Sequence, residues 1–349
     1  MKMAILKVAI YVLIVLLMLA AAFLGYFTLT DYRPGQQETL AEKSRPDVID
    51  RDTVSFMTWN IGYGGLDAGM SFFYDGGSRV RPSAQQAKDN LDYIKRRLAS
   101  EQETDIFLLQ EVDVDAKRSY HTNQFRRLHE PLSAFHGYFA LNYHVQFIPV
   151  PLRSPLGKVS SGLATYSAWL PGRVARWDYP GGYTWPKRLF MLERCFMVLR
   201  YPLQGGGQLV VINTHNSAYD QGKLKQQEMA FLKDFMIGEY EKGRHVIAGG
   251  DWNQYPPDIA SRSNRPDDLD QTATSTIPAD FMPDHWQWVY DPTVPTNRSL
   301  EAPYADSTST ALIDFFLVSP NVQPIEVKTR QLNFQNTDHH PVYGRFRLK

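Results

Sequence analysis

The chain has 349 residues, of which 37 are Lys or Arg and 37 are Asp or Glu, so its formal net charge is zero. With 43% hydrophobic and 13% aromatic residues it is too apolar for a disordered chain and long enough to bury a large core. The charge balance removes the simplest argument for nucleic-acid binding, which is a strongly basic chain. The length alone allows either two domains or one large α/β domain.

The single cysteine, Cys195, excludes an intrachain disulfide and a zinc site built from several cysteines. It stands in an apolar run, and we expect it to be a small buried side chain of a strand.

The N-terminus contains an uncharged, apolar run over residues 8–30. Its 23 residues are enough for a membrane-spanning helix and more than the usual core of a signal peptide. A long cleaved signal peptide is the alternative, with the small residues Ala20-Ala21-Ala22 as its cleavage site. Lys2 and Lys7 precede the run, so the positive-inside rule leaves the N-terminus in the cytoplasm and exports the rest. We therefore predict a single-pass protein of the cell membrane, with residues 1–30 as anchor and an extracytoplasmic domain; without a nearby cysteine, lipid anchoring is excluded.

Residues 31–53 contain two prolines and many charges without an apolar period, which predicts a stalk between the membrane and a domain that starts at residue 54. Removal of Lys2 and Lys7 leaves 35 basic and 37 acidic side chains in residues 31–349, a net charge of −2. Such a domain has no general attraction for anionic lipid or nucleic acid.

Strands and helices alternate along the remaining chain. Ser83 is a candidate N-cap, and Ala84, Ala87, Leu91, Ile94 and Leu98 form one apolar helix face. Leu224, Phe231 and Phe235 mark a second helix. Strands are predicted over residues 54–60, 106–109, 162–169, 195–203, 208–214, 245–248, 312–319 and 342–348, with a Gly-rich hairpin at residues 205–207.

Two polar, Pro-rich stretches, residues 146–158 and 254–284, interrupt this pattern. Long loops in compact domains are usually functional, so both are candidates for shaping a substrate site.

Polar side chains follow or interrupt many of the predicted strands. In a layered sheet protein, strand ends converge on one rim, so residues far apart in sequence can meet there. Carboxylates, amides and histidines without cysteine suit a hard cation, Mg²⁺ or Mn²⁺. Together with a base and donors for phosphate oxygens, this is what phosphoester hydrolysis requires. The candidates are Asn60, Glu111, His215, Asp251, Asn253, Asp314, Asp338 and His339.

Each candidate taken alone also has a structural explanation. Glu111 can be a solvated acid, Asn60 a turn cap, His215 a core histidine, and Asp251 the start of an Asx-turn. Asp314 is harder to explain in this way because it interrupts the apolar run 311–318, where an unpartnered carboxylate is costly. It is well placed to hold a histidine.

The ordered segments MTWNIGYGG, IFLLQEVD, SSGLATYS, VVINTHN, AGGDWNQ, PTNR, LIDFFLVS and TDHHPV resemble the endonuclease/exonuclease/phosphatase superfamily. That superfamily includes pancreatic-type deoxyribonuclease, abasic-site endonucleases, neutral sphingomyelinases and inositol-polyphosphate phosphatases. The resemblance spans residues 54–349 and implies one domain, a four-layered α/β sandwich of two mostly antiparallel sheets flanked by helices.

The resemblance also implies roles for the candidate residues. Glu111 matches the principal metal carboxylate, with Asn60 and Asp338 beside it. Asp251 matches the aspartate that positions or activates the attacking water. Asn253 matches a contact to phosphate or metal, and His215 matches a position that holds a phosphate oxygen. Asp338 and His339 match the closing acid–histidine pair, in which His339 competes with Asp251 for the role of base, and Asp314 matches the aspartate that orients His339.

The loops choose the substrate, and here alternatives stay open. A membrane-tethered enzyme favours a phospholipid or sphingolipid headgroup, with a nuclease of the same superfamily as the alternative and an inactive binding module as the least favoured. A local basic patch for nucleic acid would have to come from Arg118, Arg126, Arg127, Lys187, Arg188 and Arg194. The aromatic stretch 179–196 is either an interfacial anchor or core plus loop. Residues 297–299 form a glycosylation sequon. We expect the protein to be a monomer.

Overall fold

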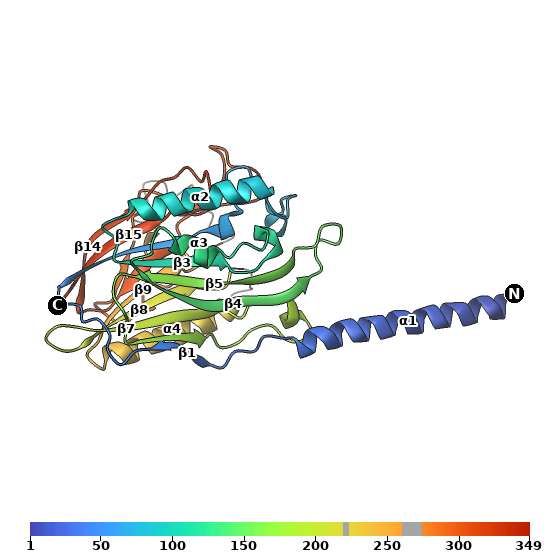
Figure 1. Cartoon of the computed structure of the whole chain (residues 1–349), viewed down its shortest axis with the longest axis horizontal. Helices are drawn as coiled ribbons and strands as arrows, with labels where there is room; N and C mark the ends of the chain where they lie inside the picture. Colours follow the sequence, from blue (N-terminus) through green and yellow to red (C-terminus); the bar gives the residue numbers. More distant parts are fainter. Residues whose placement is uncertain (219–222, 260–273) are drawn as a thin grey trace.

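Two β-sheets lie face to face with helices on their outer surfaces in the computed structural model, which describes residues 1–218, 223–259 and 274–349 (Figure 1). In chain order its main elements are α1 (Lys2–Leu29), β1 (Gln37–Glu42), β2 (Thr53–Asn60), α2 (Ala84–Ser100), β3 (Ile106–Asp113), α3 (Gln124–His129), β4 (His136–Ile148), β5 (Gly157–Ser167), β6 (Arg173–Asp178), η4 (Lys187–Phe190), β7 (Cys195–Pro202), β8 (Gln208–His215), α4 (Lys223–Tyr240), β9 (His245–Asp251), β10 (Gln287–Val289), β11 (Asn297–Arg298), β12 (Thr310–Ala311), β13 (Asp314–Val318), β14 (Val322–Thr329) and β15 (Val342–Leu348).

Within the described residues, one large sheet has seven strands in the order β1-β6-β7-β8-β9-β13-β10, and the other has six in the order β14-β15-β2-β3-β5-β4; β11 and β12 pair separately as a two-stranded sheet. Neighbouring strands are antiparallel except for one pair in each sheet, β2 with β3 and β8 with β9. The predicted α/β sandwich is therefore confirmed.

Apolar side chains fill three layers between these elements. Inward-facing residues of both sheets, such as Phe56, Leu108 and Phe316, form the central core, and Cys195 is buried in it as predicted. The outer face of the six-stranded sheet packs on α2 and α3, and that of the seven-stranded sheet packs on α4. Alternation along each strand thus gives both faces of both sheets an apolar partner.

The helix beginning at residue 84 forms as its cap predicts. The Ser83 hydroxyl accepts the backbone N–H of Gln86, and the Gln86 side chain accepts the N–H of Ser83, which closes a capping box. Leu91, Ile94 and Leu98 are buried against the sheet.

The second predicted helix forms as α4, and Phe231 and Phe235 of its predicted face pack against the outer core. Both are half-buried beside the ring of Trp177. The most buried apolar side chains of α4 are Met229, Leu232 and Met236, which the prediction did not name.

The predicted stalk is partly structured, which corrects that expectation. Within residues 31–53, β1 pairs antiparallel with β6 at the edge of the seven-stranded sheet. Further on, the N–H of Ile49 donates to Pro202 O, and the Ile49 side chain is buried. An edge strand is held mainly by backbone hydrogen bonds, which leave no apolar period in the sequence.

The two predicted loops are shorter than expected or only partly described. Residues 146–148 and 157–158 belong to β4 and β5, so residues 149–156 form the turn of a long hairpin. The second stretch, 254–284, includes residues 260–273, which lie outside the described residues.

Helix α1 projects away from the sandwich (Figure 1). Among the described residues it is the one helix long and apolar enough to cross a membrane, and its most apolar window is not buried by the domain. It is therefore a candidate membrane anchor, and a signal sequence passes the same test.

Candidate functional site

The two parallel strand pairs carry four of the candidate residues at their C-terminal ends. Asn60 ends β2 and Glu111 stands near the end of β3, while His215 and Asp251 end β8 and β9 and lie opposite each other. Because the sheets are stacked, the four ends meet: Asn60 Nδ2 lies 3.2 Å from Glu111 Oε1 and 2.9 Å from Asp251 Oδ2. The structure thus joins polar groups of both sheets in one cluster.

A bulge in β3 aims Glu111 at this cluster. The register between β3 and β5 shifts between Leu109 and Val112, and Glu111 adopts a positive φ of 54°. Bulges and left-handed non-glycine residues are costly unless the surroundings impose them, and they concentrate at functional sites. The Glu111 side chain keeps 25% exposure, so a ligand from solvent can reach its carboxylate.

Asp251 uses its two oxygens differently. Oδ1 accepts the backbone N–H of Asn253 at 3.0 Å, the Asx-turn that the sequence allowed. Oδ2 faces Asn60 and lies 3.4 Å from His215 Nε2 and 3.8 Å from His339 Nε2. One residue therefore both closes the turn after β9 and presents an oxygen to the cluster.

His339 and Asp314 form a buried pair. His339 Nδ1 lies 2.8 Å from Asp314 Oδ2, and the backbone N–H of Asp314 donates to Thr296 Oγ1. The indole N–H of Trp59 donates to the carbonyl of His339 at 3.0 Å, which ties the histidine to β2. The imidazole is thus held with its Nε2 toward Asp251.

Asp338 lies on the other side of His339, with its Oδ2 3.9 Å from Nε2. A β-carbon on Gly62 would stand 2.6 Å from Asp338 Oδ1, and Gly62 has a φ of +50°, so glycine is required there on both counts. His340 points away: its Nδ1 lies 2.8 Å from Pro295 O, and its ring stacks on Phe334.

Asn253 makes its side-chain hydrogen bond outside the cluster of carboxylates and imidazoles. Its side-chain amide donates to the carbonyl of Asn216 at 2.8 Å, and its carbonyl accepts Lys225 Nζ. Like Glu111, it has a positive φ, 50°.

Three further polar residues support the cluster and were missed as site residues. The Asn297 side-chain nitrogen lies 2.9 Å from His339 Nε2, whereas the sequence presented this residue as part of a sequon and of the family-like PTNR segment, with no role in the site. Below the cluster, Gln110 Nε2 donates to Asn213 Oδ1, and Asn213 Nδ2 donates to Ala164 O, so a buried amide pair joins the two sheets. The sequence did contain one indication of this amide pair, because Gln110 and Asn213 are polar residues inside apolar strands.

Burial and neighbouring charges shift the pKa values in this cluster. Burial, with Asp314 nearby, raises the pKa of Asp251 to about 6, and burial raises that of Asp338 to about 7. For His339, burial opposes the charged form, but the carboxylates of Asp314 and Asp338 outweigh it and raise the pKa to about 10. Burial lowers the pKa of His215 well below its ordinary value, so this imidazole is neutral at pH 7.

The donor set fits a divalent cation. The carboxylates of Asp251, Asp314 and Asp338 lie close to the His339 imidazolium, and Asp314 Oδ1 is buried without a hydrogen-bond partner. Oxygen ligands in an acidic, partly open cluster are the preference of hard cations. One compact ligand group consists of Asp251, Asp314 and His339, two of which are already bonded to each other. Outside that group, Glu111 is the most exposed carboxylate of the cluster, at 25% of its side chain.

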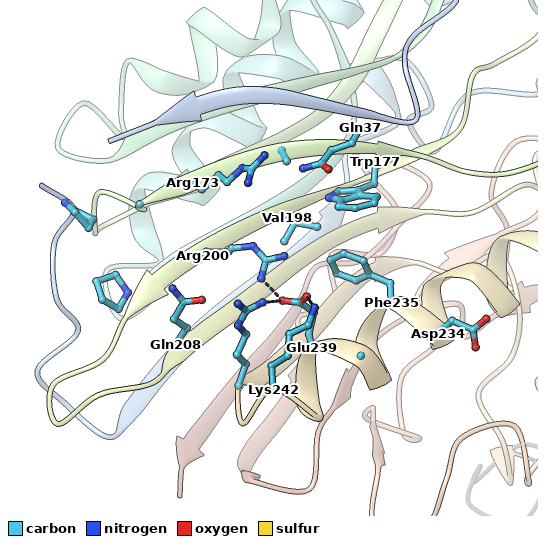
Figure 2. A pocket seen from close by; sticks show the side chains of 16 residues that line it. Gln37, Arg173, Trp177, Val198, Arg200, Gln208, Asp234, Phe235, Glu239 and Lys242 are labelled. Atoms are coloured by element: carbon cyan, nitrogen blue, oxygen red, sulfur yellow. Dashed lines mark hydrogen bonds and ion pairs between the residues drawn. The ribbon is translucent and has the colours of Figure 1, made fainter. Parts of the chain in front are cut away.

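A cavity of about 640 Å³ lies elsewhere, on the outer face of the seven-stranded sheet beside α4 (Figure 2). Trp177 and Phe235 line one side of it, and Arg200, Lys242 and Arg244 converge on Glu239 at the other. It lies near the start of β8, away from His215, and holds none of the candidate site residues.

Comparison with known proteins identifies the relatives of this arrangement. An endonuclease/exonuclease/phosphatase protein from Beutenbergia cavernae superposes with a TM-score of 0.60 at 20% identity over 85% of this chain and 72% of that one. ANGEL2, described as a 2′,3′-cyclic phosphatase and bound to adenosine-2′,3′-vanadate, gives 0.56 at 16% identity over 88% and 99%. A Bacteroides vulgatus protein of the same family gives 0.52 at 16% identity over 85% and 99%.

These solved structures share the α/β sandwich fold of this chain. A comparison of the sequence with curated proteins found no match. The model of the Endonuclease/Exonuclease/phosphatase family matches residues 57–339, which contain all eight candidate residues. Members of that family are metal-dependent phosphoesterases and nucleases, so the chain is a hydrolase of phosphoric esters. The chain belongs to the endonuclease/exonuclease/phosphatase family.

Proposed function

We propose that the protein is a membrane-anchored phosphodiesterase that uses Mg²⁺ or Mn²⁺ to release the phosphorylated headgroup of a phospholipid or sphingolipid. The observation that carries the chemistry is the meeting of Glu111 and Asn60 from one sheet with Asp251 and the buried His339–Asp314 pair from the other.

In this proposal Glu111, Asn60 and Asp338 hold the cation. A divalent ion there supplies Lewis acidity toward the phosphate and offsets the charge of the carboxylates. Binding also lowers the pKa of Asp251 and Asp338 below the values set by burial alone.

His339 and Asp251 divide the proton transfers. Three carboxylates surround His339, so its charged form persists at neutral pH. Its Nε2–H donates to a phosphate oxygen or to the leaving group when that group takes the place of the Asn297 amide nitrogen, which lies 2.9 Å from Nε2 in the structure. Asp251 then serves as the base that accepts a proton from the attacking water. Neutral His215 donates Nε2–H to a second phosphate oxygen, and Asn253 keeps the turn after β9 in place.

The position of α1 supports a substrate at the membrane surface. β3 runs antiparallel to β5 and β5 antiparallel to β4, so β3 and β4 point the same way. Val112, next to Glu111, is level with Leu141 of β4, and the β4–β5 hairpin continues from there in the same direction to Ile148, the last residue of β4. The last turns of α1 reach the domain at that end too (Figure 1). An enzyme tethered there gains effective concentration on membrane-bound substrates and gains none on soluble ones.

Nucleic acid is the less favoured substrate because half of the six basic residues named above are neutralised by carboxylates. Arg118 is buried against Asp113, Arg127 pairs with Glu130, and Arg188 pairs with Asp31. Phosphate-backbone binding depends on several unpaired Lys or Arg side chains along one surface.

The test is a substrate panel for the full chain in lipid nanodiscs with Mg²⁺. We expect water-soluble phosphorylated headgroup to be released from sphingomyelin or phospholipid, full loss of release in excess EDTA, and no release by Glu111→Gln. Vigorous cleavage of DNA with no headgroup release contradicts the lipid substrate, and full activity in EDTA contradicts the metal mechanism.

A further inference from the structure

The last turns of α1 are fixed to the domain instead of leading into a free tether. The ring of Phe190 in η4 lies 5.2 Å from that of Phe27 and 6.2 Å from that of Phe23. Trp185 Nε1 donates to Thr28 Oγ1 at 3.1 Å, and Arg188 pairs with Asp31 at 3.2 Å just beyond the helix. The direction of α1 relative to the sandwich is therefore defined.

The same segment is packed on the β4–β5 hairpin. Phe190 and Leu192 contact a small apolar cluster that includes Ile148 and Leu156, the residues at the base of the hairpin turn. The Tyr143 hydroxyl donates to Phe190 O at 3.3 Å. The hairpin and α1 are thus joined through one segment, and Figure 1 shows the hairpin turn projecting from the end of the domain that α1 leaves.

The tip of that hairpin exposes apolar side chains. After α1, Leu152 is the most exposed large apolar side chain among the described residues, at 86%, and Val150 is 40% exposed. Trp185, beside the end of α1, is 51% exposed. Soluble surfaces carry single apolar residues without consequence, but these three gather around the exit of a helix that can span a membrane.

The surrounding charge and chemistry suit the surface of a bilayer. Arg153 follows Leu152 directly, and Lys187 lies two residues after Trp185; both are exposed. Tryptophan favours the interface between lipid and water, and lysine and arginine beside it reach phosphate headgroups. A protein partner would not need to lie beside the membrane helix, whereas a bilayer necessarily does.

We infer that the turn of the β4–β5 hairpin, residues 149–156, and the Trp185 turn form a second membrane-contact surface, which dips into the bilayer interface and holds the active-site end of the sandwich against the membrane. This inference rests on the proposed membrane anchoring and deepens it, because it fixes which end of the enzyme meets the lipid.

The experiment labels single positions in the full chain. Leu152→Cys receives an environment-sensitive NBD fluorophore, and Cys195 stays unlabelled because it is buried. The control is Ile325→Cys, a 39% exposed position on β14, far from α1 (Figure 1). In nanodiscs of phosphatidylcholine and phosphatidylglycerol, the label at 152 should emit at shorter wavelength and be quenched by doxyl-labelled lipid, and the label at 325 should do neither. Equal, unquenched emission at both positions overturns the inference.

A second variant connects the surface to turnover. Leu152→Glu should lower headgroup release from nanodiscs about tenfold, equivalent to about 1.4 kcal/mol of lost bilayer contact, while hydrolysis of soluble bis-p-nitrophenyl phosphate stays unchanged. If the label at 152 is quenched but no lipid is hydrolysed, the membrane-contact surface is supported and the proposed lipid substrate is refuted. If lipid is hydrolysed without quenching, and Leu152→Glu does not change the rate, the lipid substrate is supported and the membrane-contact surface is refuted.

Discussion

The buried His339–Asp314 pair gives the sharpest prediction. With 2.8 Å between Nδ1 and Oδ2 and neither side chain reached by bulk solvent, the carboxylate is the nearest of the charges that keep the imidazole protonated. A positioned acid or base contributes about 10²–10⁴ in rate, so His339→Ala should lose at least that much in kcat. Asp314→Asn should lose activity in the same direction because the amide holds the ring without supplying its charge.

The two residues should act as one unit. The double variant His339→Ala/Asp314→Asn should therefore be about as active as His339→Ala alone, since Asp314 has no role once the ring is gone. In Asp314→Asn the pKa of His339 should fall, so that the rate declines at a lower pH on the alkaline side than in the unchanged enzyme. Steady-state kinetics against pH, with an NMR titration of the His339 ring, measure both effects. Independent, multiplicative rate losses, or an unmoved pKa, refute the reasoning.

Three further predictions follow from the cluster. In the metal-free protein, folding raises the pKa of His339 to about 10 from an ordinary 6.5, so the protonated ring contributes its full stabilisation below pH 6.5 and loses it as the pH rises through 10. Chemical denaturation should therefore show a free energy of unfolding that falls from pH 7 to pH 9. His339→Gln should remove most of that pH dependence. Gly62→Ala should abolish activity because its new β-carbon displaces Asp338. The control is Gly76→Ala, at a position that also has a left-handed φ, 87°, but where the new β-carbon would meet only the Glu301 side chain at 3.9 Å; it should cost about 1–2 kcal/mol of stability and leave kcat intact. Equal losses of kcat in the two variants would refute this role of Gly62. Asn297→Ala should change the rate through His339 Nε2 without changing Mg²⁺ affinity, which calorimetry checks; a large loss of metal affinity would place Asn297 among the ligands instead.

Much of the fold followed from the sequence because buried strands and capped helices carry local signals. The N-cap at Ser83, the Gly-rich hairpin between β7 and β8 and the interrupted run around Asp314 each predicted a feature that the structure contains. The cluster was also foreseeable, since its members stand at the ends of predicted strands.

Other features depend on contacts that a single sequence does not encode locally. The edge strand β1 is held by backbone hydrogen bonds, so nothing in its composition separated it from a stalk. The bulge that turns Glu111 into the site depends on the register with β5. Asn297 comes close to His339 only through a bridge between residues 42 positions apart in the chain. Such non-local pairings need the tertiary structure.

The central claim is that Glu111 lies at a metal centre. Crystals of the full chain soaked in Mn²⁺ and measured at the manganese absorption edge test it directly, because the anomalous signal locates the ion without assumptions about chemistry. We expect a peak within about 2.5 Å of a Glu111 carboxylate oxygen, with Asn60 or Asp338 as a further ligand, and no peak there in Glu111→Gln. A peak held by Asp251, Asp314 and His339 with Glu111 outside ligand distance, or no bound ion at all, would contradict it.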